Sequence, residues 1–212
     1  MKIDETYFRA LLHETMDDNP LCCRAVLSIC KVEFTNKVPT LCVSLKRPST
    51  LSVNLQFVSE NCSTEPQVKA LIIHEFLHIL LGHTTRFKRM TPALNIALDA
   101  VINAIIHRKL GSEYSRIMTN YYSDSVGAVR LLRPISEIEH QRFWDFCRRA
   151  DLGKSEQDEF ALLKLHNAIY DGSLVSDDVL DLVRQMKSDA ADDLLKSGKV
   201  LIGGHGQWGD PF

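Results

Sequence analysis

One stretch of the sequence, Ala70–Leu81, is apolar on almost every side of a helix and yet carries three ionisable side chains. Its apolar residues are too frequent for a surface helix, so the rest of the fold must enclose this helix. The ionisable residues are His74, Glu75 and His78. Because a buried polar group without a partner is costly, these three side chains need a polar or ionic partner inside the protein.

The spacing of the two histidines suits a metal ion. Adjacent residues of a helix are about 100° apart, so His74 and His78 lie on one face, one turn apart, and can reach a single ion. Neutral imidazole is a good zinc ligand. Glu75 lies beside the pair, where it can remove a proton from a water that the ion has made more acidic. We therefore predict a Zn²⁺ site with Glu75 as the catalytic general base.

A third metal ligand has two candidates, and the first is Asp99. With Asn95 and Asn103 it forms a narrow polar stripe, at four-residue steps, on an otherwise apolar helix. That stripe must face something polar inside the protein. We predict that Asp99 binds the metal. The alternative is that its carboxylate accepts a hydrogen bond from a ring N–H of a metal-binding histidine.

The second candidate is His83, which in a continuous helix would lie about 140° from His78 and point away from the ion. Gly82 can end the helix and redirect the chain, which would bring His83 back toward the site. The alternative is a histidine that interacts with the helix dipole and solvent. We rank His83 below Asp99 as the third ligand.

The order of the expected elements indicates an α+β fold. The spacing of apolar residues predicts two opening helices and three strands, at 5–18, 20–30, 31–34, 40–45 and 51–58. The motif helix should begin near residue 65, after the capping-box pair Thr64 and Gln67, and end at Gly82. A second apolar helix is expected at 92–110. A loop rich in Tyr and Ser, three further helices and a Gly-rich tail should follow, the helices at about 136–150, 155–171 and 176–197.

Two segments together resemble a known family. Leu71–Arg86 contains H-E-x-x-H-x-x-x-x-H and Asn95–Asn103 contains N-x-A-x-D-x-x-x-N, a combination similar to the zinc metallopeptidase-type domain of bacteria and phages. The resemblance covers roughly residues 35–110 and implies a zincin-like fold, with a small mixed sheet packed on the motif helix. It implicates His74, Glu75, His78, His83 and Asp99 in the site.

The resemblance carries three further expectations. It implies that strand 51–58 is the edge that pairs with an extended substrate. The segment Gly203–Gly206 is similar to a Gly-rich, His-containing segment of longer relatives. Those relatives continue into a von Willebrand factor A-like module, whereas this sequence ends at Phe212, so a function that depends on that module is not expected. We expect residues 1–125 to form the zincin-like core and residues 126–212 a helical extension and tail, together one compact unit.

Charge and hydropathy reduce the classes of partner that we expect for this protein. A formal net charge of −2 gives no electrostatic reason to expect nucleic acid or an anionic membrane as the main partner. The first residues are acidic where a signal peptide would be basic, and no run approaches about 18 apolar residues. We therefore expect a cytoplasmic protein that binds neither nucleic acid nor a membrane. Its six cysteines form no C-x-x-C pair and are expected to be free thiols.

Two functions remain. The first is a zinc-dependent metallopeptidase-type hydrolase, in which activated water attacks a peptide or amide carbonyl of a peptide or protein substrate. The alternative is a catalytically silent metal-binding scaffold or interaction protein that acts with a separately encoded regulatory partner. Glu75 discriminates between them, because a structural metal site has no need of a general base. A hydrolase also needs an oxyanion-stabilising group, for which Tyr121, Tyr122 and His107 are candidates.

Overall fold

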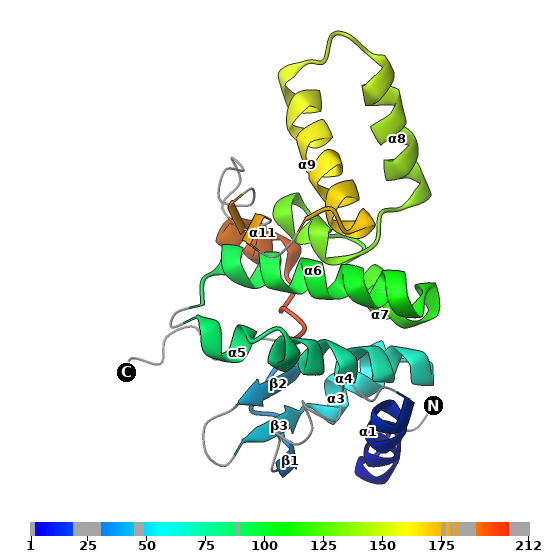
Figure 1. Cartoon of the computed structure of the whole chain (residues 1–212), viewed down its shortest axis with the longest axis vertical. Helices are drawn as coiled ribbons and strands as arrows, with labels where there is room; N and C mark the ends of the chain where they lie inside the picture. Colours follow the sequence, from blue (N-terminus) through cyan, green and yellow to red (C-terminus); the bar gives the residue numbers. More distant parts are fainter. Residues whose placement is uncertain are drawn as a thin grey trace.

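The computed structural model describes residues 3–18, 31–44, 49–87, 90–174, 177–178, 180–181 and 190–203, and these residues form an α+β fold (Figure 1). Helices dominate, and three short strands form one mixed sheet. The helices, including the 3₁₀ helix η1, are α1 (Glu5–Asp18), α3 (Leu55–Asn61), α4 (Glu65–Leu80), α5 (His83–Arg86), α6 (Pro92–Leu110), α7 (Ser112–Tyr121), η1 (Gly127–Leu132), α8 (Glu137–Arg148), α9 (Lys154–Asp171) and α11 (Ala190–Ser197). The helix expected at 20–30 lies outside the described residues.

The sheet consists of β1 (Lys31–Phe34), β2 (Leu41–Ser44) and β3 (Thr50–Val53), in the order β1-β3-β2. β3 is the central strand, parallel to β1 and antiparallel to β2. The small mixed sheet of three strands is therefore confirmed. β2 lies at one edge, which matters for the site because this strand contacts the motif helix α4.

The third strand is shorter than expected, and the prediction of a strand over 51–58 is wrong. Its apolar residues alternate as in a strand, but the strand ends at Val53 and α3 begins at Leu55. Asn54 causes the change, because its side chain accepts a hydrogen bond from the Phe57 amide at 3.2 Å and so caps the helix. The residues read as the second half of a strand instead form a helix that packs into the core.

The two helices that carry the predicted site have the expected boundaries. α4 begins with the capping box of Thr64 and Gln67, and α6 begins after Thr91, whose side chain accepts a hydrogen bond from the Leu94 amide. Gly82, with φ of 72°, ends the motif segment in a left-handed conformation that favours glycine. Figure 1 shows α4 between the sheet on one side and α6 with α7 on the other. Enclosure on both sides explains why α4 is apolar nearly all round.

The helix α7 was not predicted. The segment expected to be a loop rich in Tyr and Ser begins as α7, which buries Ser115, Ile117 and Met118. Gly111, with φ of 91°, lets the chain turn directly from α6 into α7. Tyrosine and serine are weak helix formers, so the burial of one face, rather than propensity, stabilises this helix.

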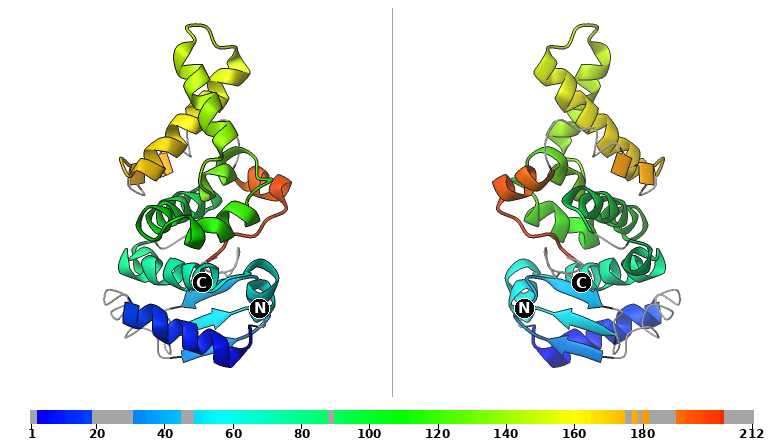
Figure 2. Two further views of the ribbon diagram at one scale, coloured as in Figure 1. Left: turned by 90° about the vertical axis from the view of Figure 1, so that its right-hand side faces the viewer. Right: turned by 90° about the vertical axis from the view of Figure 1, so that its left-hand side faces the viewer.

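Helices α8 and α9 form a hairpin that projects away from the sheet, as the two further views also show (Figure 2). Helices α8 and α9 were expected at nearly these positions. Helix α11 falls within the helix expected at 176–197. Residues 182–189 of that expected helix lie outside the described part of the chain. One hydrophobic core extends from Ile3 to Ile202 and includes residues of both expected units. None of the described helices has the length and apolarity needed to cross a membrane. Cys62 and Cys147 are free thiols, as expected.

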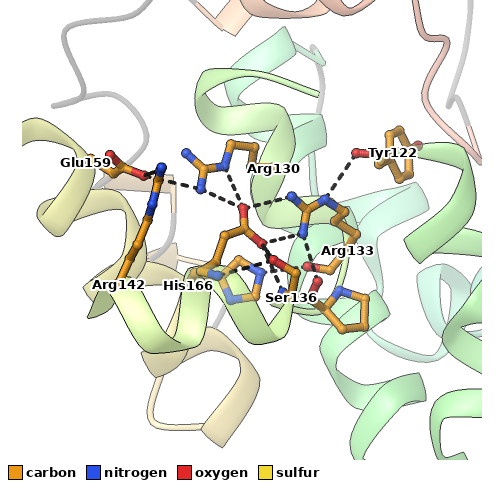
Figure 3. Close-up of polar contacts among 9 residues, drawn as sticks. Tyr122, Arg130, Arg133, Ser136, Arg142, Glu159 and His166 are labelled. Carbon is orange, nitrogen blue, oxygen red and sulfur yellow. Dashed lines mark hydrogen bonds and ion pairs between the residues drawn. The ribbon is translucent and has the colours of Figure 1, made fainter. Parts of the chain in front are cut away.

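A buried ion-pair network joins this hairpin to the rest of the fold (Figure 3). Glu139, at the start of α8, accepts hydrogen bonds from the guanidinium groups of Arg130 and Arg133 at 2.6–3.1 Å. Arg133 also donates from Nε to the backbone carbonyl of Tyr122 at 3.2 Å. His166 of α9 lies with Nε2 at 2.6 Å from the Arg133 carbonyl oxygen. The network therefore holds the hairpin and the end of α7 in one place.

Candidate metal centre

Three of the predicted site residues converge in the interior between α4 and α6. His74 and His78 of α4 and Asp99 of α6 each offer a ligand atom, and these atoms lie within 4.8 Å of one another. The two Nε2 atoms are 3.0 Å apart, and Asp99 Oδ1 lies 3.1 Å from His78 Nε2 and 3.7 Å from His74 Nε2. A tetrahedral ion with ligands at about 2.0–2.1 Å would space such atoms by about 3.3 Å. This buried group could therefore hold a metal ion.

Asn103 determines which nitrogen of His74 faces the cluster. Its Nδ2 donates to the Leu132 carbonyl at 2.9 Å, so its Oδ1, 2.9 Å from His74 Nδ1, is the acceptor. The proton of the neutral ring is thereby placed on Nδ1. The lone pair of Nε2 then points at His78 and Asp99, which is the arrangement a metal ligand requires.

His83 lies on the other side of His78. It is the first residue of α5, directly after the turn at Gly82, and its Nδ1 is 3.2 Å from His78 Nδ1. Burial, together with the charge of Arg86, lowers the pKa of His83 to about 4, so the ring is neutral near pH 7. Gly82 does redirect the chain toward the site, but His83 meets the Nδ1 edge of His78 and Asp99 the Nε2 edge. The geometry favours Asp99 as ligand and His83 as an outer partner.

Glu75 lies next to the cluster, and only one of its two carboxyl oxygens has a hydrogen-bond partner. Oε2 accepts a hydrogen bond from the Val43 amide of β2 at 3.2 Å, whereas Oε1 is buried and has no hydrogen-bond partner. Burial raises the pKa of Glu75 to about 8, against the opposing effect of the Val43 hydrogen bond. An unpaired buried oxygen is costly, so Oε1 calls for a partner of its own.

The backbone of Gly203 passes close beside these groups. A Cβ atom at this glycine would lie 2.6 Å from His74 Nε2 and 2.7 Å from Glu75 Oε1. Only a residue without a side chain can therefore pass beside both a candidate ligand atom and the unpaired oxygen. The donor atoms of His74, His78 and Asp99 fit a metal ion.

The charges of the cluster also favour a cation. Burial, and then the negative charge of Glu75, raise the pKa of Asp99 well above its usual value. Two carboxyl groups and two imidazoles enclosed without solvent require either protons or a positive ion to balance them. The full burial of His74, Glu75 and His78, each 0% exposed, makes this requirement strict.

The remaining candidates have other partners. His107 lies with Nδ1 at 2.8 Å from Ser115 Oγ. Tyr121 OH accepts a hydrogen bond from the Val200 amide at 3.2 Å, and Tyr122 OH accepts one from the Ile202 amide at 2.9 Å. Burial, and after it the charge of Asp99, raise the pKa of Tyr122, so this hydroxyl is electrostatically coupled to the cluster.

Sequence reasoning missed two contributors to the site. The Val43 amide holds Glu75, and Gly203 borders the ligand atoms, yet neither residue carries a functional side chain. For Gly203 one signal was present, the Gly-rich composition of the segment that begins with it. Nothing local in the sequence indicates the role of the Val43 amide.

Comparisons of the chain with protein-family models, with curated proteins and with solved structures found no match. The case for a metal centre therefore depends on the buried group of His74, His78 and Asp99 and on what surrounds it.

Proposed function

We propose that this chain is a zinc-dependent metallopeptidase-type hydrolase with a zincin-like core, acting on a peptide or protein substrate. The observation that carries the proposal is the unpaired Oε1 of Glu75 beside the ligand cluster of His74, His78 and Asp99. A metal held only for structure would leave that buried oxygen without a purpose.

Each residue of the site has a separate role in the proposed hydrolysis. His74, His78 and Asp99 would hold the ion, which lowers the pKa of a nearby water and polarises a substrate carbonyl. Glu75 takes the proton of that water at Oε1 and passes it to the leaving amine. The Val43 amide holds the other carboxyl oxygen at 3.2 Å and so orients Oε1 toward the ligands. Asn103 keeps His74 in the tautomer that presents Nε2.

The proposal is tested with zinc analysis and the Glu75→Gln variant. Wild type purified without chelators should contain about one zinc per chain and cleave members of a broad peptide library. Glu75→Gln should keep the zinc and lose about 10²–10⁴-fold in hydrolysis, because a neutral amide cannot take the proton. Glu113→Gln, which changes an exposed carboxylate of α7, is the matched control and should retain wild-type activity.

A catalytically silent metal-binding scaffold is the second candidate, and the complete burial of the site favours it, since His74, Glu75 and His78 are all 0% exposed. A scaffold would act through a separately encoded partner and would not use Glu75 chemically. If wild type and Glu75→Gln carry equal zinc and behave alike with purified protein and in cells, the scaffold function replaces the hydrolase.

A further inference from the structure

The last described residues of the chain lie over the candidate site. After α11 the orange-red segment runs past α6 toward α4 and the beginning of β2 (Figure 1, Figure 2). It ends at Gly203, against His74 and Glu75. No substrate could reach residues that are 0% exposed, so a hydrolytic site of this kind must open, and the terminal segment is one element that covers it.

Backbone hydrogen bonds hold this segment, which turns at Ile202 and Gly203. The Gly203 amide donates to Thr40 Oγ1 at 3.3 Å, and the same hydroxyl lies 3.3 Å from the Leu201 carbonyl oxygen, to which it can donate. The Ile202 amide donates to Tyr122 OH at 2.9 Å. Thr40 precedes the edge strand β2, whose Val43 amide binds Glu75. Backbone groups of the segment are thus paired with side chains that border the site.

The side chains of the segment indicate which residue types this position accepts. Leu201 and Ile202 are buried, at 5% and 1% exposure, and Gly203 follows them at the position closest to the ligands. A side chain at residue 203 would collide with His74 and Glu75, so the place beside the base accepts only a glycine in this pose. Two apolar residues followed by a glycine therefore fit the position that this segment occupies beside the site.

We propose that Leu201–Gly203 occupies the peptide-binding cleft of the metal centre as a built-in, substrate-like inhibitor. The cleft accordingly binds peptides with two apolar residues followed by a glycine at a turn, through Thr40 and Tyr122. This inference rests on the proposed hydrolase function for the statement that the occupant resembles a substrate. It adds that the chain is latent until the segment leaves.

Release of the segment is sterically and structurally feasible. The site residues stand on α4 and α6, which are enclosed helices, whereas the segment is tethered through α11. One tether is Asp193, which is 3% exposed and accepts a hydrogen bond from the Ala128 amide at 3.0 Å. Weakening this contact loosens the segment without altering any residue of the cleft.

The test uses the full-length chain and a fluorescent peptide with the sequence of residues 199–204, measured by anisotropy in the presence of EDTA. In wild type the segment competes with the peptide, so apparent binding is weak. Gly203→Ala excludes the segment from the cleft and should tighten peptide binding by about tenfold or more. Gly198→Ala is the matched control, because Gly198 also has positive φ (60°) but a Cβ there meets nothing within 4 Å.

A peptide with valine in place of the glycine should not bind any variant. Asp193→Ala provides a second route to release if Gly203→Ala does not fold, and it should also tighten peptide binding. Amide hydrogen exchange at residues 202 and 203 reports whether the segment has left the cleft. Unchanged peptide binding after exchange has risen would overturn the proposal, and so would full protection of these amides in both variants, which would make the segment a fixed wall.

The same measurements separate this inference from the proposed function, because peptide binding is read without metal and without turnover. Tighter binding in Gly203→Ala without hydrolysis by the zinc-loaded protein contradicts the hydrolase alone. Hydrolysis with no change in peptide binding contradicts the inhibitory segment alone.

Discussion

His78 Nε2 lies 3.1 Å from Asp99 Oδ1, a contact that joins α4 to α6 in the interior of the protein. The opposite edge of the same imidazole, at Nδ1, meets His83 at 3.2 Å. His78 therefore meets polar groups at both edges of its ring, and of Asp99 and His83 only Asp99 lies on the side that also faces His74.

Asp99→Ala is expected to weaken zinc binding by about 10-fold or more, because it removes a ligand or, at the least, the carboxylate that orients one. His83→Ala should weaken it less, since His83 contacts the ring edge that faces away from the cluster. Competition with a zinc chelator of known affinity measures both. Loss of zinc from His83→Ala, with Asp99→Ala still loaded, would reverse the ranking.

Asn103→Leu should also weaken zinc binding by about tenfold, because the His74 ring loses the partner that sets its tautomer. It should lower the free energy of unfolding of the metal-free protein by about 1–3 kcal/mol, since the buried Leu132 carbonyl loses its donor. Asn95→Leu is the control on the same stripe. Its buried Oδ1 has no hydrogen-bond partner, so the substitution should cost little in zinc affinity or stability.

Glu139 should make the fold sensitive to acid. Burial alone would raise its pKa, but hydrogen bonds from Arg133, Ser136 and Arg130 outweigh burial and hold the pKa far below the ordinary value of 4.5. A depressed pKa stabilises the fold above pH 4.5, and this stabilisation is lost as the pH falls further. Glu139→Gln should lower the free energy of unfolding at pH 7 by about 1–3 kcal/mol.

Urea unfolding at pH 7 and at pH 4 tests this expectation. The difference between wild type and Glu139→Gln should shrink at the lower pH, because the carboxyl group of unfolded wild type, with its ordinary pKa of 4.5, takes up a proton while that of the folded protein stays ionised. Glu156→Gln breaks an exposed pair with Arg149 and should change stability by less than about 1 kcal/mol. Equal effects of the two substitutions at pH 7 would show that the Glu139 network contributes no more than a surface pair.

Local signals predicted the elements that carry the site. The capping box of Thr64 and Gln67 and the glycines at 82 and 111 lie where the structure begins or ends α4 and α6. The polar stripe on α6 pointed inward for a physical reason, because buried polar groups need partners. It correctly placed Asp99 beside the histidines. Asn103, which was expected only to face something polar, contacts His74.

The errors arose where local pattern and tertiary context disagree. Apolar alternation extended the third strand through Asn54, whose capping side chain starts α3 instead. The helix α7 exists because one face is buried, which its residue types alone do not indicate. The approach of Gly203 to His74 could not be predicted, since it joins distant parts of the chain through backbone groups that leave no pattern in the sequence.

The position of Gly203 has a consequence for how the protein is made. The candidate ligands all lie before residue 100, whereas the segment that seals them is synthesised last among the described residues. A nascent chain can therefore bring α4 against α6 before Gly203 covers His74. A metal ion that binds this group can enter at that stage, as well as when the segment leaves the site of the finished protein.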